Sequence, residues 1–132
     1  LSSKGFSVNM VPVEKAVAAV ACVLVSDHKM DKQRLTGLEV FSGVLDKVPL
    51  VKASPLNVEC RYQREIVLGD YRLVLGEIVE IHACENALNE QGQADAKVFD
   101  PLVYLGGIRE YWSLDKKEAD AYRAGLALLS KD

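Results

Sequence analysis

Cysteine is scarce in this sequence, and the residues present are far apart. The three are Cys22, Cys60 and Cys84, so none forms a Cys-x-x-Cys pair and they cannot all be joined within one chain. This argues against a disulfide framework and favours reduced, buried thiols in a cytoplasmic protein. His82 and Cys84 share a strand face as potential metal ligands, but zinc sites have more closely paired ligands, so we expect no metal site.

Long apolar runs and an excess of positive charge are also missing. No run approaches the roughly 18 apolar residues of a membrane-spanning helix, and no signal-peptide pattern opens the chain. The 16 Lys and Arg residues are outnumbered by 19 Asp and Glu residues, which gives a net charge of -3. Because phosphate backbones are bound by basic surfaces, we expect no nucleic-acid partner. The lack of a long apolar run leads us to expect no membrane partner either. The chain is long enough for one domain, and we expect residues 1–132 to form it.

What the sequence does contain is a long alternating stretch from Leu56 to Ala83. In its first arm the alternate positions from Asn57 to Glu65 are polar, and the positions between and beyond them carry the apolar residues Leu56, Val58, Cys60, Tyr62, Ile66 and Leu68. This alternation predicts a strand with one buried face and one solvent face. Gly69-Asp70 suits a type II′ hairpin turn. Gly76 interrupts the second arm, and an internal glycine often marks a bulge or a close backbone approach. We therefore predict a long, bent antiparallel hairpin that forms part of a closed sheet.

Shorter patterns predict the remaining elements around this hairpin. Val13, Val17, Val20 and Leu24 recur at about 3.6 residues, which predicts an amphipathic helix over residues 13–24. Residues 38–51 are irregular, with room for a short strand. The other expected elements are strands at 6–10 and 102–105, a short helix between Asp31 and Gly37, and a helix over 116–129 behind a capping box of Asp115 and Glu118. The expected fold class is mainly β with flanking helices.

Four segments, in order, also match the pattern of a known family. They are Gly5-Phe6-Ser7-Val8-Asn9, the pair Val48-Pro49-Leu50-Val51 and Ser54-Pro55-Leu56-Asn57-Val58-Glu59-Cys60, the stretch from Leu68-Gly69-Asp70 to Gly76-Glu77-Ile78-Val79, and Asp100-Pro101-Leu102-Val103-Tyr104-Leu105-Gly106-Gly107 with Tyr111-Trp112-Ser113-Leu114. The chain thereby resembles the flavin reductase-like, FMN-binding split-barrel family, particularly its flavoredoxin-like branch. Roughly the first third of that family's domain has no counterpart here.

The resemblance implies a homodimer of six-stranded Greek-key split β-barrels, incomplete in this chain. FMN would lie in the groove between subunits, reduced by NAD(P)H or passing electrons to a redox partner. Hydride chemistry would belong to the flavin, so the resemblance requires no catalytic side chain. The function expected from it is that of an FMN-binding oxidoreductase of the flavin reductase or flavoredoxin type. The alternative is a flavin-free dimerisation or binding module on the same barrel.

The resemblance also names cofactor-binding candidates, and each has a plainer reading. Ser26, His28 and Lys32 would face the flavin phosphate. The alternative, to which we give equal weight, is that this segment is a solvated polar loop. Tyr71 would lie near the flavin ring, or be a strand-end tyrosine with its ring on the core, which is the reading we favour. Asn9 is either a ligand or, as we prefer, a hydrogen-bonding residue near the end of its strand.

Overall fold

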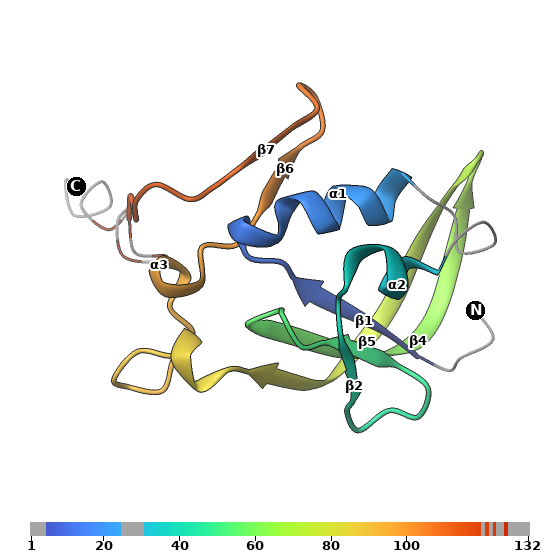
Figure 1. Ribbon diagram of the computed structural model, residues 1–132, viewed down its shortest axis with the longest axis horizontal. Helices are drawn as coiled ribbons and strands as arrows, with labels where there is room; N and C mark the ends of the chain where they lie inside the picture. Colours follow the sequence, from blue (N-terminus) through green and yellow to red (C-terminus); the bar gives the residue numbers. More distant parts are fainter. Residues whose placement is uncertain (1–4, 25–30, 120, 122, 124–125, 127–132) are drawn as a thin grey trace.

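A three-stranded antiparallel sheet forms the centre of the molecule, in the order β1-β4-β5 (Figure 1). Its strands are β1 (Gly5–Met10), β4 (Leu56–Leu68) and β5 (Tyr71–Ala83). The computed structural model describes residues 5–24, 31–119, 121, 123 and 126. Strands predominate among them and helices flank the sheet, so the predicted mainly-β fold class is confirmed.

The long hairpin lies where the alternation predicted it. β4 and β5 are 13 residues each and pair from Leu56 with Ala83 to Leu68 with Tyr71. The connecting Gly69 has φ 61°, and Asp70 is not among the residues with positive φ, which agrees with the expected type II′ turn. Local turn chemistry and period-2 patterning therefore sufficed to fix both arms.

Gly76 lies at both a bulge and a close approach, as predicted. It pairs with Tyr62 beside one of two register shifts in the hairpin, the one between Tyr62 and Arg64. A Cβ atom at Gly76 would sit 2.6 Å from Cε1 of Phe6 and 3.1 Å from the Cβ of Cys60. The Phe6 ring thus occupies the space over Gly76, so a larger residue there would displace it.

A small hairpin covers one face of the main sheet. β2 (Val40–Ser42) pairs with β3 (Pro49–Val51), and these strands bring Leu50 and the preceding Val48 into the core at 0% and 3% exposure. The polar face of β4 was predicted to meet solvent. That prediction is correct for Arg61 and Gln63 but wrong for Asn57 and Glu59, the two positions that the small hairpin covers. Asn57 is 3% exposed and Glu59 is 0% exposed, because β3 and the β2–β3 loop lie over them.

The first two helices are placed as expected, but the apolar stripe of α1 is not covered. A 3-10 turn, η1 (Val13–Lys15), leads into α1 (Ala16–Leu24). α2 (Lys32–Thr36) begins after Asp31, whose carboxylate accepts from two backbone amides, and ends at Gly37 with φ 67°. None of the α1 residues is buried, and Val17 and Leu24 are 85% and 78% exposed. The described part of this chain therefore supplies no core for that stripe.

The C-terminal region forms a separate hairpin. After η2 (Glu85–Ala87) and α3 (Ala96–Phe99), β6 (Val103–Leu105) pairs with β7 (Glu110–Trp112). The strand expected at 102–105 is thus present but, in the part of the chain described, does not join the main sheet. Leu102 instead donates its amide to the Val11 carbonyl at 2.8 Å, which ties the base of this hairpin to the end of β1.

The helix expected from Lys116 does not begin there. Residues 113–119 have no helical structure, and Lys116 forms a surface ion pair with Glu118 at 3.2 Å in place of a capping box. Most of residues 120–129 lie outside the described part. None of the described helices has the length and apolar character needed to cross a membrane.

Candidate functional site

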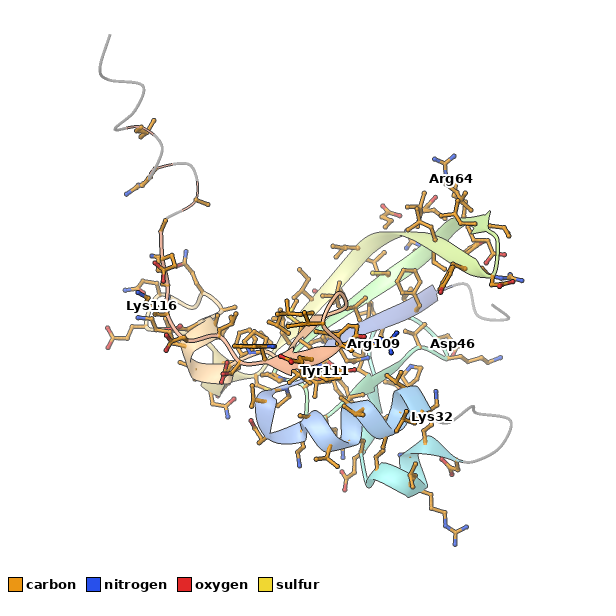
Figure 2. The ribbon with its side chains drawn as sticks, turned by 90° about the horizontal axis from the view of Figure 1, so that it is seen from above. Lys32, Asp46, Arg64, Arg109, Tyr111 and Lys116 are labelled. Carbon is orange, nitrogen blue, oxygen red and sulfur yellow. The ribbon has the colours of Figure 1, made fainter. Side chains whose placement is uncertain are left out.

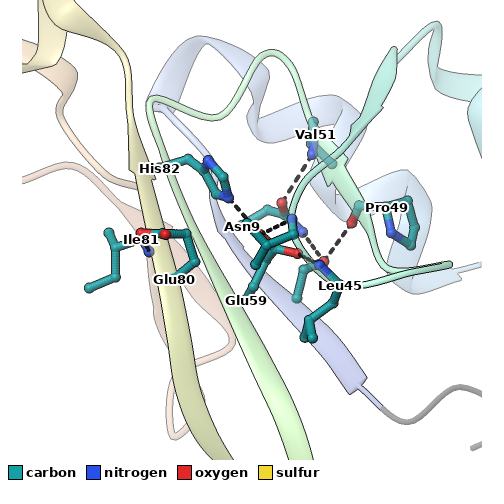
Figure 3. Close-up of polar contacts among 10 residues, drawn as sticks. Asn9, Leu45, Pro49, Val51, Glu59, Glu80, Ile81 and His82 are labelled. Carbon is teal, nitrogen blue, oxygen red and sulfur yellow. Dashed lines mark hydrogen bonds and ion pairs between the residues drawn. The ribbon is translucent and has the colours of Figure 1, made fainter.

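Polar side chains line the covered face of the main sheet at matching positions on its three strands. One row is Asn9, Asn57 and His82, and the next is Ser7, Glu59 and Glu80, each row joined by β-ladder pairing. Because cross-strand partners project on the same side, the three strands present a polar layer beneath β2 and β3. Figure 3 shows the contacts of this layer.

Glu59 is the centre of the polar layer. One carboxylate oxygen, Oε2, accepts from the Val44 amide at 2.9 Å and contacts Nε2 of His82 at 2.6 Å, and the other, Oε1, accepts from the Leu45 amide at 2.8 Å. The His82 side chain is 30% exposed, whereas that of Glu59 is 0% exposed. A fully buried carboxylate thus joins β4, β5 and the β2–β3 loop.

The charge state of Glu59 follows from these contacts. Burial raises the pKa of this carboxyl, but the hydrogen bonds from His82, Val44 and Leu45, together with the charge of His82, outweigh burial and hold the pKa below its ordinary value. Glu59 is therefore an acceptor-only group at neutral pH, which suits the three donors around it.

Gly43 leaves the room that this carboxylate needs. A Cβ at position 43 would lie 2.5 Å from Cδ and 2.7 Å from Oε1 of Glu59. No real Cβ tolerates such distances, so glycine is required here by close approach and not by backbone conformation.

Asn9, the first cofactor candidate, has both side-chain polar atoms engaged within the chain. Its Oδ1 accepts from the Val51 amide and its Nδ2 donates to Oγ of Ser7, both at 3.0 Å. Ser7 in turn donates to the Pro49 carbonyl at 2.7 Å. This geometry agrees with the reading of Asn9 as a strand residue that fastens β3 to β1.

The other candidates are spread over separate elements. Lys32 is the first residue of α2 and lies near α1, well apart from Arg64 in the far part of β4 (Figure 2). Tyr71 begins β5 beside the hairpin turn and is 80% exposed, so the favoured alternative, a ring on the core, is wrong. Ser26 and His28 lie outside the described residues, and their roles stay predictions.

Two hollows of the surface are lined by residues other than these candidates. The first, of about 280 Å³, has Lys52, Cys84 and Phe99 on its walls, and the second, of about 820 Å³, lies between residues 89–100 and 114–117. Neither is lined by Asn9, Lys32 or Tyr71. These two hollows are therefore not the flavin site predicted from the candidate residues.

Large apolar side chains are exposed on several parts of the molecule. The face of the main sheet opposite Glu59 carries Val8 and Ile81 at 47% and 53% exposure. Others lie on α1, described above, at the tip of the long hairpin, and on the β6–β7 hairpin, where the rings of Tyr104 and Tyr111 lie 4.8 Å apart and Trp112 is 52% exposed. Apolar surface of this kind is usually covered by another polypeptide or a ligand.

Comparison with known proteins identifies the family. Residues 1–113 match the flavin reductase like domain. The chain belongs to this family. A flavoredoxin from Methanosarcina acetivorans is 32% identical, with a TM-score of 0.87 over 96% of this chain and 67% of that one. Flavoredoxin of Desulfovibrio vulgaris is 23% identical, with a TM-score of 0.85 over 94% of this chain and 66% of that one, which shows the fold alone.

The flavin reductase-like assignment confirms the resemblance read from the sequence motifs, and the split-barrel fold with it. An uncharacterised protein of Deinococcus radiodurans is 30% identical over 103 residues, which are 75% of this chain and 45% of that protein. The chain thus spans less than half of this curated relative and about two thirds of the two flavoredoxins.

Sequence reasoning missed the polar layer of this family member. The signal available was a repeated pair of polar residues on each of three strands, at Ser7 and Asn9, at Asn57 and Glu59, and at Glu80 and His82. Taken strand by strand, such residues read as a solvent face. Taken together, with strand pairing known, they form a layer that another element can cover.

Proposed function

We propose that the protein is an FMN-binding oxidoreductase of the flavin reductase or flavoredoxin type. The observation that carries the proposal is the 32% identity to a flavoredoxin over 96% of this chain, at a TM-score of 0.87. FMN, when bound, supplies the hydride and electron transfer. NAD(P)H or a redox partner is the proposed electron donor, and the cytoplasm is the proposed location, in keeping with the few, unpaired cysteines.

The positions of Lys32 and Tyr71 support a flavin site that is formed by two subunits together. The hollows described above do not include Lys32 or Tyr71, yet Tyr71 offers a ring at 80% exposure and Lys32 offers a positive charge. A tyrosine ring can stack on a flat aromatic ligand, and a lysine can pair with a phosphate. We propose that these two residues, with Ser26 and His28, contribute to a groove completed by a second subunit.

Binding of FMN is the first test. Titration of FMN fluorescence with the full-length protein is expected to give quenching with a Kd on the order of 10 µM or tighter. Addition of NADH or NADPH should then bleach the flavin absorbance if a nicotinamide nucleotide is the donor. Absence of quenching would favour the alternative, a flavin-free dimerisation or binding module on the same barrel.

The assignment of Lys32 is tested in the same titration. Lys32→Ala is expected to weaken FMN binding by about three- to tenfold, because a charge-assisted contact to phosphate is lost. Lys15→Ala removes the same charge from η1 and serves as the matched control, with unchanged affinity expected. Equal affinities for the two variants would contradict the assignment of Lys32 and leave the proposal of FMN binding standing.

We also propose that the protein is a homodimer. Support comes from the exposed apolar residues, which an assembly would cover. They lie on α1, on the face of the main sheet opposite Glu59 and on the β6–β7 hairpin. Sedimentation at micromolar concentration is expected to give twice the 14.5 kDa of one chain. A single species at the monomer mass would contradict the dimer and, with it, a cofactor groove between subunits.

A further inference from the structure

The β2–β3 loop, residues Gly43 to Val48, meets the main sheet at Glu59, which accepts from the backbone amides of Val44 and Leu45. The strand that follows the loop, β3, is held separately, by hydrogen bonds to Asn9 and Ser7 of β1. We propose that Glu59 and His82 form a pH-operated latch, which holds this loop over the sheet when Glu59 is ionised and releases it in acid. The β1-β4-β5 sheet stays paired when the latch opens.

Hydrogen-bond chemistry explains why one proton is enough to open the latch. An ionised carboxylate only accepts, so it can satisfy the two amides and His82 at once. Protonation turns one oxygen into a donor that faces another donor at 2.6 to 2.9 Å. Since Glu59 is 0% exposed, no solvent lies beside it to take over the lost bond.

The charged and polar groups that lie near Glu59 come from β5, from β1 and from the loop itself. His82 faces the carboxylate from β5, with its ring edge-on to Phe41 at 6.0 Å. Glu80, also on β5, is exposed and accepts from the Ile81 amide, and the β1 neighbour Ser7 is uncharged. On the loop itself the charged residues are Asp46 and Lys47, both exposed.

The direction follows from the pKa of Glu59, which lies below its ordinary value of 4.5 in the folded protein. A carboxyl with a lowered folded pKa stabilises the closed loop above the unfolded value, and this contribution is lost as the pH falls through the folded value. The latch is thus expected to open below about pH 4.5 and to stay closed at neutral pH.

Amide hydrogen exchange followed by NMR tests the latch in the full chain. The protection factors of the Val44 and Leu45 amides, corrected for intrinsic exchange, are expected to fall about tenfold or more between pH 5 and pH 3. Amides in the β4–β5 ladder should keep their protection over the same range. Equal losses in the loop and in the ladder would mean general acid unfolding and would overturn the proposal.

Variants separate the latch from a merely structural contact. Glu59→Gln mimics the protonated acid, so its loop amides should be poorly protected at every pH. This variant should not show the fall in protection between pH 5 and pH 3, which we call the step. His82→Gln keeps a neutral donor but removes the histidine charge, so the step should move to higher pH. Glu77→Gln, at an exposed pair with Arg61, is the control and should retain the wild-type step. A wild-type step that persists in Glu59→Gln would also overturn the proposal.

Discussion

Replacement of Glu59 by alanine is expected to lower the free energy of unfolding by about 3–5 kcal/mol at neutral pH. The variant leaves the amides of Val44 and Leu45 and the ring of His82 without their common acceptor, in a place that solvent does not reach. Each buried donor without a partner costs about 1–3 kcal/mol. Urea denaturation followed by circular dichroism measures the loss.

A carboxylate on the same strand pair provides the comparison. Glu77 pairs with Arg61 at 2.9 Å, but both side chains are more than half exposed, so Glu77→Ala should change stability by no more than about 1 kcal/mol. The difference between wild type and Glu59→Ala should also shrink below about pH 4.5, where the wild-type carboxyl becomes protonated. Equal losses for the two variants would show that the buried contacts of Glu59 contribute nothing beyond a surface pair.

Gly43→Ala is expected to destabilise the protein by about 3 kcal/mol, although it adds a single methyl group. The new Cβ would lie 2.5 Å from Cδ of Glu59, so the carboxylate must move and lose its alignment with the loop amides. Gly107→Ala is the matched control, because a Cβ there meets nothing within 4 Å and its φ is not left-handed. That variant should change stability by less than about 0.5 kcal/mol.

A double-mutant cycle then assigns the cost of Gly43→Ala to Glu59. In the Glu59→Ala background the obstructing carboxylate is gone, so the same substitution at Gly43 should cost less than about 1 kcal/mol. Denaturant midpoints of the four proteins give the coupling energy. Additive losses would mean that the methyl group disturbs the loop backbone and not the carboxylate.

Local patterns in the sequence were enough to place the long hairpin and the first two helices. Alternation with a Gly-Asp turn predicted the ends of β4 and β5, and the spacing of four apolar residues predicted the helix over 13–24. The Asp31 cap and Gly37 gave α2 in the same way. These signals concern neighbouring residues, whose conformations are restricted whatever the rest of the chain does.

Which face each element buries could not be predicted in the same way. Alternation distinguishes two faces of β4 but does not say which one another segment covers, and the amides that meet Glu59 come from 14 and 15 residues earlier. The exposed stripe of α1 is the opposite case, since an apolar spacing was present without a covering surface in the described chain. Of the cofactor candidates, only the local placement of Asn9, Lys32 and Tyr71 could be compared with the structure.

The two register shifts of the long hairpin bear on how homologous sequences should be aligned. One shift adds Val79 to β5, between the pairs Glu59–Glu80 and Cys60–Ile78, and the other adds Gln63 to β4, between Tyr62–Gly76 and Arg64–Leu75. The additions lie on opposite strands, so the pairing beyond the second continues the register found before the first. Each bulge absorbs its own extra residue, so a relative that lacks Val79 or Gln63 keeps the pairs on both sides of that position. Single alignment gaps in this hairpin should therefore fall at these two positions. A gap elsewhere in either arm would exchange the two faces of the residues between the gap and the turn.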